Sequence, residues 1–164
     1  MSRFLFMGDF DIQIDCEFDF SRTIYGMDQR LLLAVNEINR PLDKANLTVI
    51  VLGKESGATM GGLRVLVMRP GRSTATAKKD MQHFNGQIRL VRQNSRIRVL
   101  HREKGSLVWL LLQEASFTDT PLSFGLALQN FNSEMREIDA VETVTVAIDN
   151  FKVNSAQQIT ESDI

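Results

Sequence analysis

The sequence is poor in several residue types, and each shortage excludes a class of protein. Cys16 is the only cysteine in 164 residues, so no disulfide can form within the chain. No apolar run approaches the ~20 residues of a transmembrane helix. The first residues, MSRFLFMGDF, lack the apolar core and cleavage site of a signal peptide. We therefore expect a cytoplasmic protein without a membrane span, or a domain cut from a longer extracellular or cell-surface chain.

Neither sign of charge is in excess. Lysine and arginine number 19, aspartate and glutamate number 20, and the formal net charge is -1. A general nucleic-acid binder would carry a basic excess, so we expect no nucleic-acid partner. Hydrophobic residues make up 43% of the chain and charged residues 24%, as in ordinary globular proteins. We expect one domain over residues 1–153 and a flexible tail over residues 154–164.

The stretch from Gly86 to Leu112 predicts three consecutive antiparallel strands. Asn94 and Ser95 suit a two-residue hairpin turn, because asparagine tolerates the left-handed backbone that this turn requires. Gln93 then pairs with Arg96, which sets the register of the ribbon. The polar run 103–106 forms the second corner. The predicted core face carries Ile88, Leu90, Ile97 and Val99, and the outer face carries Gln87, Arg89, Arg96, Arg98 and Arg102.

Apolar and polar residues alternate strictly from Asp9 to Phe20, which predicts a strand with one buried face. Cys16 lies on that face and reads as a structural thiol. The opposite face carries the acidic row Asp9, Asp11, Asp15, Glu17 and Asp19. Carboxylates suggest calcium as a cofactor, but alternate strand residues stand about 6.6 Å apart in a line, not around one point. We interpret the row as a solvated face paired with arginines on a neighbouring strand, and we assign no metal site.

Further short apolar runs, bounded by turn residues, predict more strands over 30–38, 47–52, 63–68, 122–131 and 143–153. No long amphipathic helix is evident. Arg72 to Asn85 is the longest predicted loop and contains His83. Asp149 and Asn150 are expected to fix the backbone at a strand end. About ten strands without helices predict an all-β, two-sheet antiparallel sandwich.

Four segments together resemble the concanavalin A-like lectin/glucanase superfamily, especially its LamG-like bacterial branch. They are GDFDIQIDCEF, GQIRLVRQNSRIRVLHREKGSLVW, PLSFGLALQNF and VAIDNFKV, in the order that the branch shows. The similarity runs from Arg3 to Val153. It implies a jelly roll of two antiparallel sheets whose relatives often bind glycans on the concave sheet or at the loop rim. The function must still be argued from the site, because one fold hosts many activities.

On this basis we expect a non-catalytic, lectin-like module that binds carbohydrate or a protein. Arg89, Arg96 and Arg98 are the predicted ligand-binding residues, because guanidinium groups hold an acidic polysaccharide or phosphate in bidentate fashion. The loops 72–85 and 23–29 would complete the surface. If the acidic row lies beside these arginines in the sheet, the two faces neutralise each other. The sequence shows no aromatic platform for sugars, since Trp109 and Tyr25 are its only tryptophan and tyrosine.

The alternative is a glycoside hydrolase. Glu137, Asp139 and Glu142 match the Glu-x-Asp-x-x-Glu pattern of laminarinase-type enzymes of the same superfamily. That resemblance makes the first glutamate the nucleophile, the aspartate its orienting partner and the last glutamate the acid/base. Retaining hydrolysis needs the two carboxyl groups about 5 to 5.5 Å apart, which on a strand requires a β-bulge. The position near the C-terminus and the lack of tryptophan-rich subsites favour a chance match.

Overall fold

The computed structural model describes residues 4–19, 27–38, 40–41, 44–55, 58–70, 72–132 and 145–157. These ranges contain ten strands and no helix. The strands are β1 (Phe4–Asp19), β2 (Met27–Glu37), β3 (Leu47–Lys54), β4 (Gly62–Arg69), β5 (Arg72–Asp80), β6 (His83–Gln93), β7 (Arg96–Glu103), β8 (Leu110–Ser116), β9 (Leu122–Asn132) and β10 (Val146–Gln157). Every pairing between them is antiparallel, so the all-β prediction is confirmed.

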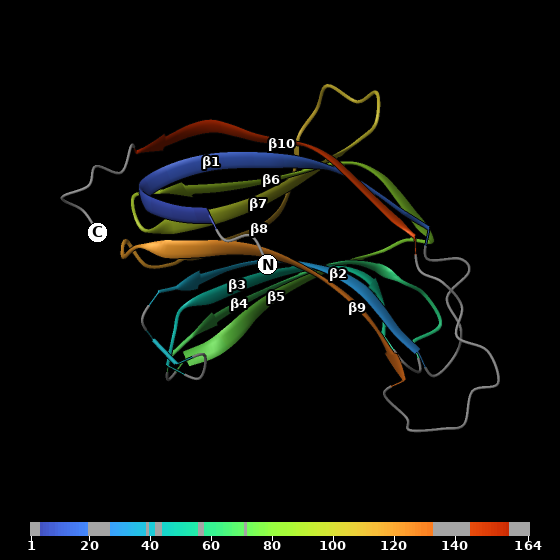
Figure 1. Ribbon diagram of the computed structural model, residues 1–164, viewed down its shortest axis with the longest axis horizontal. Coiled ribbons are helices and arrows are strands. Elements are labelled where there is room, and N and C mark those ends of the chain that lie inside the picture. Colours follow the sequence, from blue (N-terminus) through green and yellow to red (C-terminus); the bar gives the residue numbers. More distant parts are fainter. Residues whose placement is uncertain are drawn as a thin grey trace.

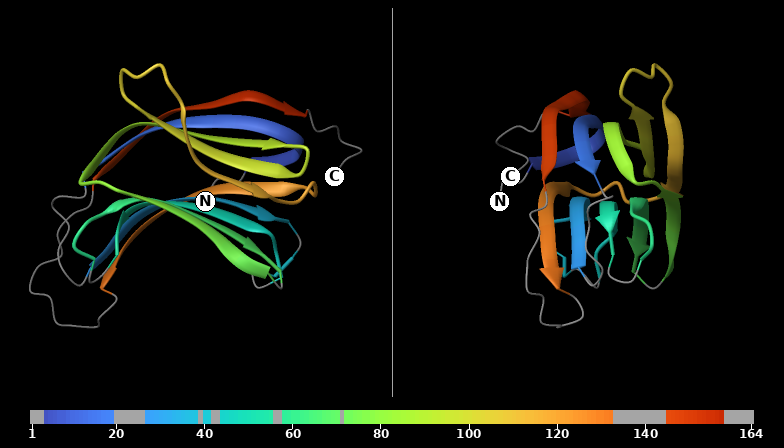
Figure 2. Two further views of the ribbon diagram at one scale, coloured as in Figure 1. Left: turned by 180° about the vertical axis from the view of Figure 1, so that it is seen from behind. Right: turned by 90° about the vertical axis from the view of Figure 1, so that its right-hand side faces the viewer.

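The strands form two facing layers (Figures 1 and 2). The lower layer, called sheet A, has the order β5-β4-β3-β2-β9, and the upper layer, called sheet B, has the order β10-β1-β6-β7-β8. Strand β1 joins them: its residues Phe4 to Phe6 pair with β9, from Met7 onward it pairs with β10, and from Phe10 onward also with β6. At the opposite edge β5 lies beside β8, so the sheet is nearly closed.

The core fills the space between the layers, and alternate residues supply it. On β1, every second residue from Phe10 to Phe18 is buried, including Cys16. Burial, with a smaller contribution from the Asp15 charge, raises the pKa of the Cys16 thiol to about 12, in agreement with a structural role. The predicted core side chains of the ribbon are also buried: Ile88, Leu90, Ile97 and Val99.

The turn between β6 and β7 is the one predicted from the sequence. Asn94 and Ser95 have φ angles of 49° and 57°, both left-handed, and Gln93 pairs with Arg96. The second corner is longer than predicted. Strand β8 begins only at Leu110, so residues 104–109 form a loop that projects from the body (Figures 1 and 2).

The prediction of a loop from Arg72 to Asn85 is wrong. Residues Arg72–Asp80 form β5, whose Ala77 pairs with Val65 of β4, and His83 opens β6. Strand β5 lies at an edge of sheet A, its residues 73–77 are serine, threonine and alanine, and the other four are charged. Small residues bury little apolar surface and therefore give a weak hydrophobic signal, although threonine favours strands.

The C-terminal strand also differs from expectation. Strand β10 runs to Gln157, four residues beyond Val153, where the flexible tail was predicted to follow. Asp149 and Asn150 lie inside this strand and not at its end. They form an irregularity opposite β1, where Asn150 has a φ of 49° and its amide N–H donates to Asp149 Oδ1 at 2.7 Å. The two residues thus fix a β-bulge.

Candidate functional site

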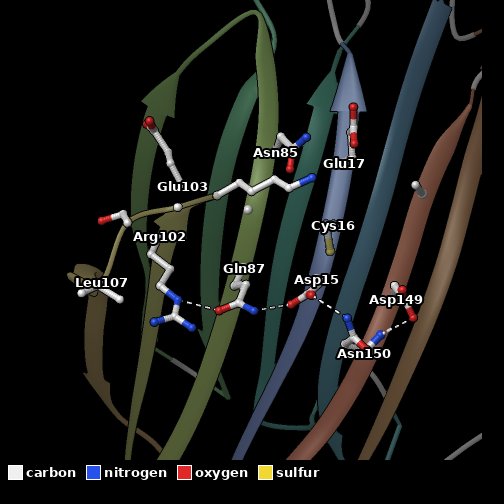
Figure 3. Close-up of a pocket in the computed structure, with 15 residues that line it drawn as sticks. Asp15, Cys16, Glu17, Asn85, Gln87, Arg102, Glu103, Leu107, Asp149 and Asn150 are labelled. Atoms are coloured by element: carbon white, nitrogen blue, oxygen red, sulfur yellow. Dashed lines mark hydrogen bonds between the residues drawn. The ribbon is translucent and has the colours of Figure 1, made fainter.

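The outer face of sheet B carries a groove of about 510 Å³. Its walls come from the strand β10 and from the beginning of the projecting loop, at Lys104 to Leu107 (Figure 3). Strands β1, β6 and β7 form its floor. The polar side chains that line it include Asp15, Glu17, Asn85, Gln87, Arg102 and Asn150.

Four of these side chains form a continuous hydrogen-bonded row across four strands (Figure 3). Arg102 Nε donates to Gln87 Oε1 at 2.5 Å, and Gln87 Nε2 donates to Asp15 Oδ1 at 2.5 Å. From the other side, Asn150 Nδ2 donates to Asp15 Oδ2 at 2.9 Å. Strand register makes the row, because Gln87 is the direct partner of both Arg102 and Asp15. The bulge in β10 brings Asn150 to its end.

Trp109 lies against the same face at the base of the projecting loop. Its ring centroid is 4.5 Å from the Arg102 guanidinium carbon and 5.5 Å from that of Arg89. Arg89 is itself fixed by Asp11, because its Nε donates to Asp11 Oδ1 at 2.8 Å and its Nη2 donates to the other carboxylate oxygen. The hydrogen bonds from Arg89 hold the pKa of Asp11 below its usual value, although burial opposes this.

The three arginines predicted to bind ligand lie on the outer face of sheet B but have different partners. Arg89 and Arg98 line a second depression of about 480 Å³ at another part of the face. Arg96 instead pairs with Glu114 at 2.6 Å. Since Arg89 is paired with Asp11, the acidic row does lie beside the basic face, the arrangement in which we expected mutual neutralisation. Arg98 donates to the neutral amide of Gln93 at 2.9 Å. An anion site around Arg98 stays a prediction.

The loops assigned to that ligand surface are placed differently. Residues 72–80 form the edge strand β5 of sheet A, and residues 27–29 begin β2 of the same sheet. Neither of these two segments is a loop. Residues 83–85, however, open β6 of sheet B, the strand that carries Arg89, and Asn85 lines the groove. Residues 23–26 lie outside the described part of the chain. The ligand surface itself stays a prediction.

The alternative catalytic residues Glu137, Asp139 and Glu142 all lie outside the described residues, so the geometry of that motif stays a prediction. Within the described ranges, no group of three or more histidine, cysteine or acidic side chains could hold a metal ion. His101 is buried edge-on to Phe84, with ring centroids 6.5 Å apart. Burial, helped by the Lys79 charge, lowers its pKa. This agrees with a packed histidine.

Sheet A offers a different surface. It arches so that its outer side is concave (Figure 2). The register of its strands places apolar side chains in the middle of that side, among them Leu32, Val49, Leu66 and Ala127. A polar row crosses one end of this side, where Arg64 of β4 and Arg30 of β2 both donate to Glu55, and Arg30 also pairs with Asp28. The depression beside Glu55 and Arg64 has a volume of only about 10 Å³, against about 510 Å³ for the groove. The groove on sheet B is therefore the better candidate for a ligand site.

Comparison with known proteins adds a family but no activity. Residues 1–154 match the family described as "Protein of unknown function (DUF1583) C domain", and the chain belongs to this family. No curated protein matches the sequence. A similar solved structure is a functionally unknown protein from Saccharomyces cerevisiae, with a TM-score of 0.60 and 14% identity over 95% of this chain and 74% of that one. At this identity the likeness concerns the fold alone. The described residues contain no helix suited to crossing a membrane.

Proposed function

We propose that this DUF1583 C domain is a non-catalytic, lectin-like module of concanavalin A-like jelly-roll type, and that it binds a carbohydrate in the groove on sheet B. The supporting observation is the row Arg102, Gln87, Asp15 and Asn150, which runs along the floor of an open volume of about 510 Å³.

The row has the chemistry that sugar hydroxyls require. Each hydroxyl both donates and accepts a hydrogen bond, and neighbouring hydroxyls pair with planar groups such as carboxylate, amide and guanidinium. Gln87 keeps a second N–H, and each Asp15 oxygen keeps a further lone pair. Because these side chains are already held by one another, a ligand loses little entropy in ordering them. Glu17 and Asn85 add polar groups nearby (Figure 3).

The same hydrogen bonds favour binding over catalysis. A glycosidase needs a carboxylic acid that gives up a proton to the leaving oxygen. In the groove both oxygens of Asp15 instead accept hydrogen bonds from side-chain amides, those of Gln87 and Asn150. Asp15 thus presents two hydrogen-bond acceptors, which suits the binding of sugar hydroxyls.

A glycan array with neutral and acidic glycans, run with calcium and with a chelator, tests the proposal. We expect a neutral glycan to bind, with about a tenfold or greater loss of affinity in Gln87→Ala, since hydrogen bonds to the ligand and within the row disappear together. Gln82→Ala, an exposed glutamine outside the groove, is the matched control and should bind as wild type.

Two results would contradict this assignment. The first is the absence of any glycan ligand, and the second is unchanged affinity in Gln87→Ala. Binding of acidic glycans that is lost in Arg98→Ala would instead move the site to the depression beside Arg98. Hydrolysis of a bound glycan that is abolished by Glu137→Gln would support the glycosidase alternative.

A further inference from the structure

The projecting loop between β7 and β8 presents apolar side chains to solvent. Leu107 is 90% exposed and Val108 is 63% exposed, and the first two residues of β8, Leu110 and Leu111, are 49% and 56% exposed. We call residues 104–111 the Leu107 loop. It stands clear of both layers (Figures 1 and 2). Contiguous exposed apolar residues of this kind mark an interaction surface.

The loop is held in this raised conformation. Lys104 N donates to Asn85 O at 2.9 Å, and Ser106 N donates to Glu103 O at 3.0 Å. At the tip, Val108 N donates to Ser106 Oγ at 3.2 Å. These hydrogen bonds, within the loop and to β6, hold the loop in the conformation that leaves Leu107 exposed. The apolar tip is therefore preorganised for an occupant outside the chain.

The succession of apolar, aromatic and charged side chains from the tip of the loop to its base indicates what kind of partner the loop contacts. At the tip the aliphatic side chains of Leu107 and Val108 stand beside Ser106, the half-buried indole of Trp109 follows at the base, and the guanidinium groups of Arg102 and Arg89 contact the indole. Acyl chains, the interfacial region and headgroups of a bilayer succeed one another in the same order, and indole rings favour the intermediate layer. A protein pocket would not require this gradient.

We propose that the Leu107 loop inserts its tip into the surface of a phospholipid bilayer. Lys104 is the only charged residue within the loop, and the adjoining Glu103 lies 3.7 Å from Lys79. Asp15 and Glu17, on the same face of sheet B, oppose attraction to anionic lipid. Insertion thus depends on apolar contact, so zwitterionic lipid suffices and high salt does not release the protein. The groove ligand plays no part in this inference.

The fluorescence of Trp109 can report insertion of the loop, because Trp109 is the only tryptophan in the sequence. Phosphatidylcholine vesicles should shift its emission to shorter wavelength, brominated acyl chains should quench it, and the protein should sediment with the vesicles in low and high salt. The double variant Leu107→Ser, Val108→Ser should partition at least about tenfold more weakly. Leu128→Ser, an exposed leucine of β9 in sheet A, is the matched control and should partition as wild type.

Circular dichroism and thermal melting would establish that the variants fold, which is expected because all three side chains are exposed. The inference is overturned if phosphatidylcholine gives neither a spectral shift nor co-sedimentation, an outcome that would leave a protein as the occupant. It is also overturned if the double variant partitions as wild type. Binding that needs phosphatidylserine and disappears in high salt would overturn it as well, because charge and not insertion would then drive it.

Discussion

Arg92 of β6 donates a hydrogen bond from Nε to the backbone carbonyl oxygen of Gly8 in β1, at 2.7 Å. Gly8 has a φ of 57° and lies where β1 leaves sheet A for sheet B. The same guanidinium donates to the carbonyl oxygen of Thr120 at 2.6 Å and lies 5.2 Å from the Phe10 ring centroid. One buried cation therefore ties the crossing of β1 to the segment before β9 and so fixes the two layers together.

Arg92→Met should destabilise the fold by about 3 kcal/mol, because it leaves the partly buried carbonyl oxygens of Gly8 and Thr120 without these donors. Urea denaturation measures the loss. Arg98→Met, on the half-buried outer face, is the control and should change the free energy of unfolding by about 0.5 kcal/mol or less. Equal stability of Arg92→Met and wild type would show that the cation does not hold the layers.

Glu37 makes stability depend on pH. Burial alone would raise its pKa, but the Asn46 amide and the hydroxyls of Thr120 and Thr118 together hold the pKa below the usual value. A carboxyl whose pKa is lower in the folded state contributes stability above the unfolded pKa, near 4.3, and loses it as pH falls through the folded pKa. Denaturation of wild type and Glu37→Gln should differ at pH 7 and converge in acid. Glu17→Gln, at an exposed position, is the control. A constant difference across this range would refute the assignment.

The hairpin turn offers a stabilising change. Ser95 has a φ of 57°, a conformation that costs a side-chain-bearing residue free energy and costs glycine little. Ser95→Gly should therefore raise the free energy of unfolding by about 0.5–1 kcal/mol. Ser116 of β8 is the control, because its φ is not positive. Ser116→Gly should therefore lower the free energy of unfolding by a similar amount. Thermal melting of both variants tests this prediction. A lower melting temperature of Ser95→Gly would contradict it, because the Ser95 side chain would then contribute more stability than its positive φ costs.

The sequence predicts the parts of this fold whose signal is periodic. The alternation along β1, the Asn94-Ser95 turn and the buried face of the ribbon are all confirmed, because each depends on local spacing. The edge strand β5 is not predicted from the sequence, because its small residues do not produce an alternation of large apolar and polar side chains. The length of the Leu107 loop is not predicted either, because its apolar residues read as the start of a strand.

The groove was predictable only in part. Gln87 and Arg102 follow from the ribbon register, and Asp15 from the alternation on β1. Their assembly into one row depends on β6 pairing with β1, a contact between distant segments that the sequence does not specify. Asn150 joins the row only because a bulge interrupts β10, and no local sequence pattern predicts that bulge.

The side-chain amides of the groove give the most direct test of where the ligand lies. In a nitrogen–proton correlation spectrum titrated with the glycan that binds on the array, we expect the NH₂ signals of Asn85, Gln87 and Asn150 to shift together, with a common dissociation constant. Shifts that instead cluster on the concave side of sheet A, at the backbone amides of Val49 and Leu66, would contradict the account.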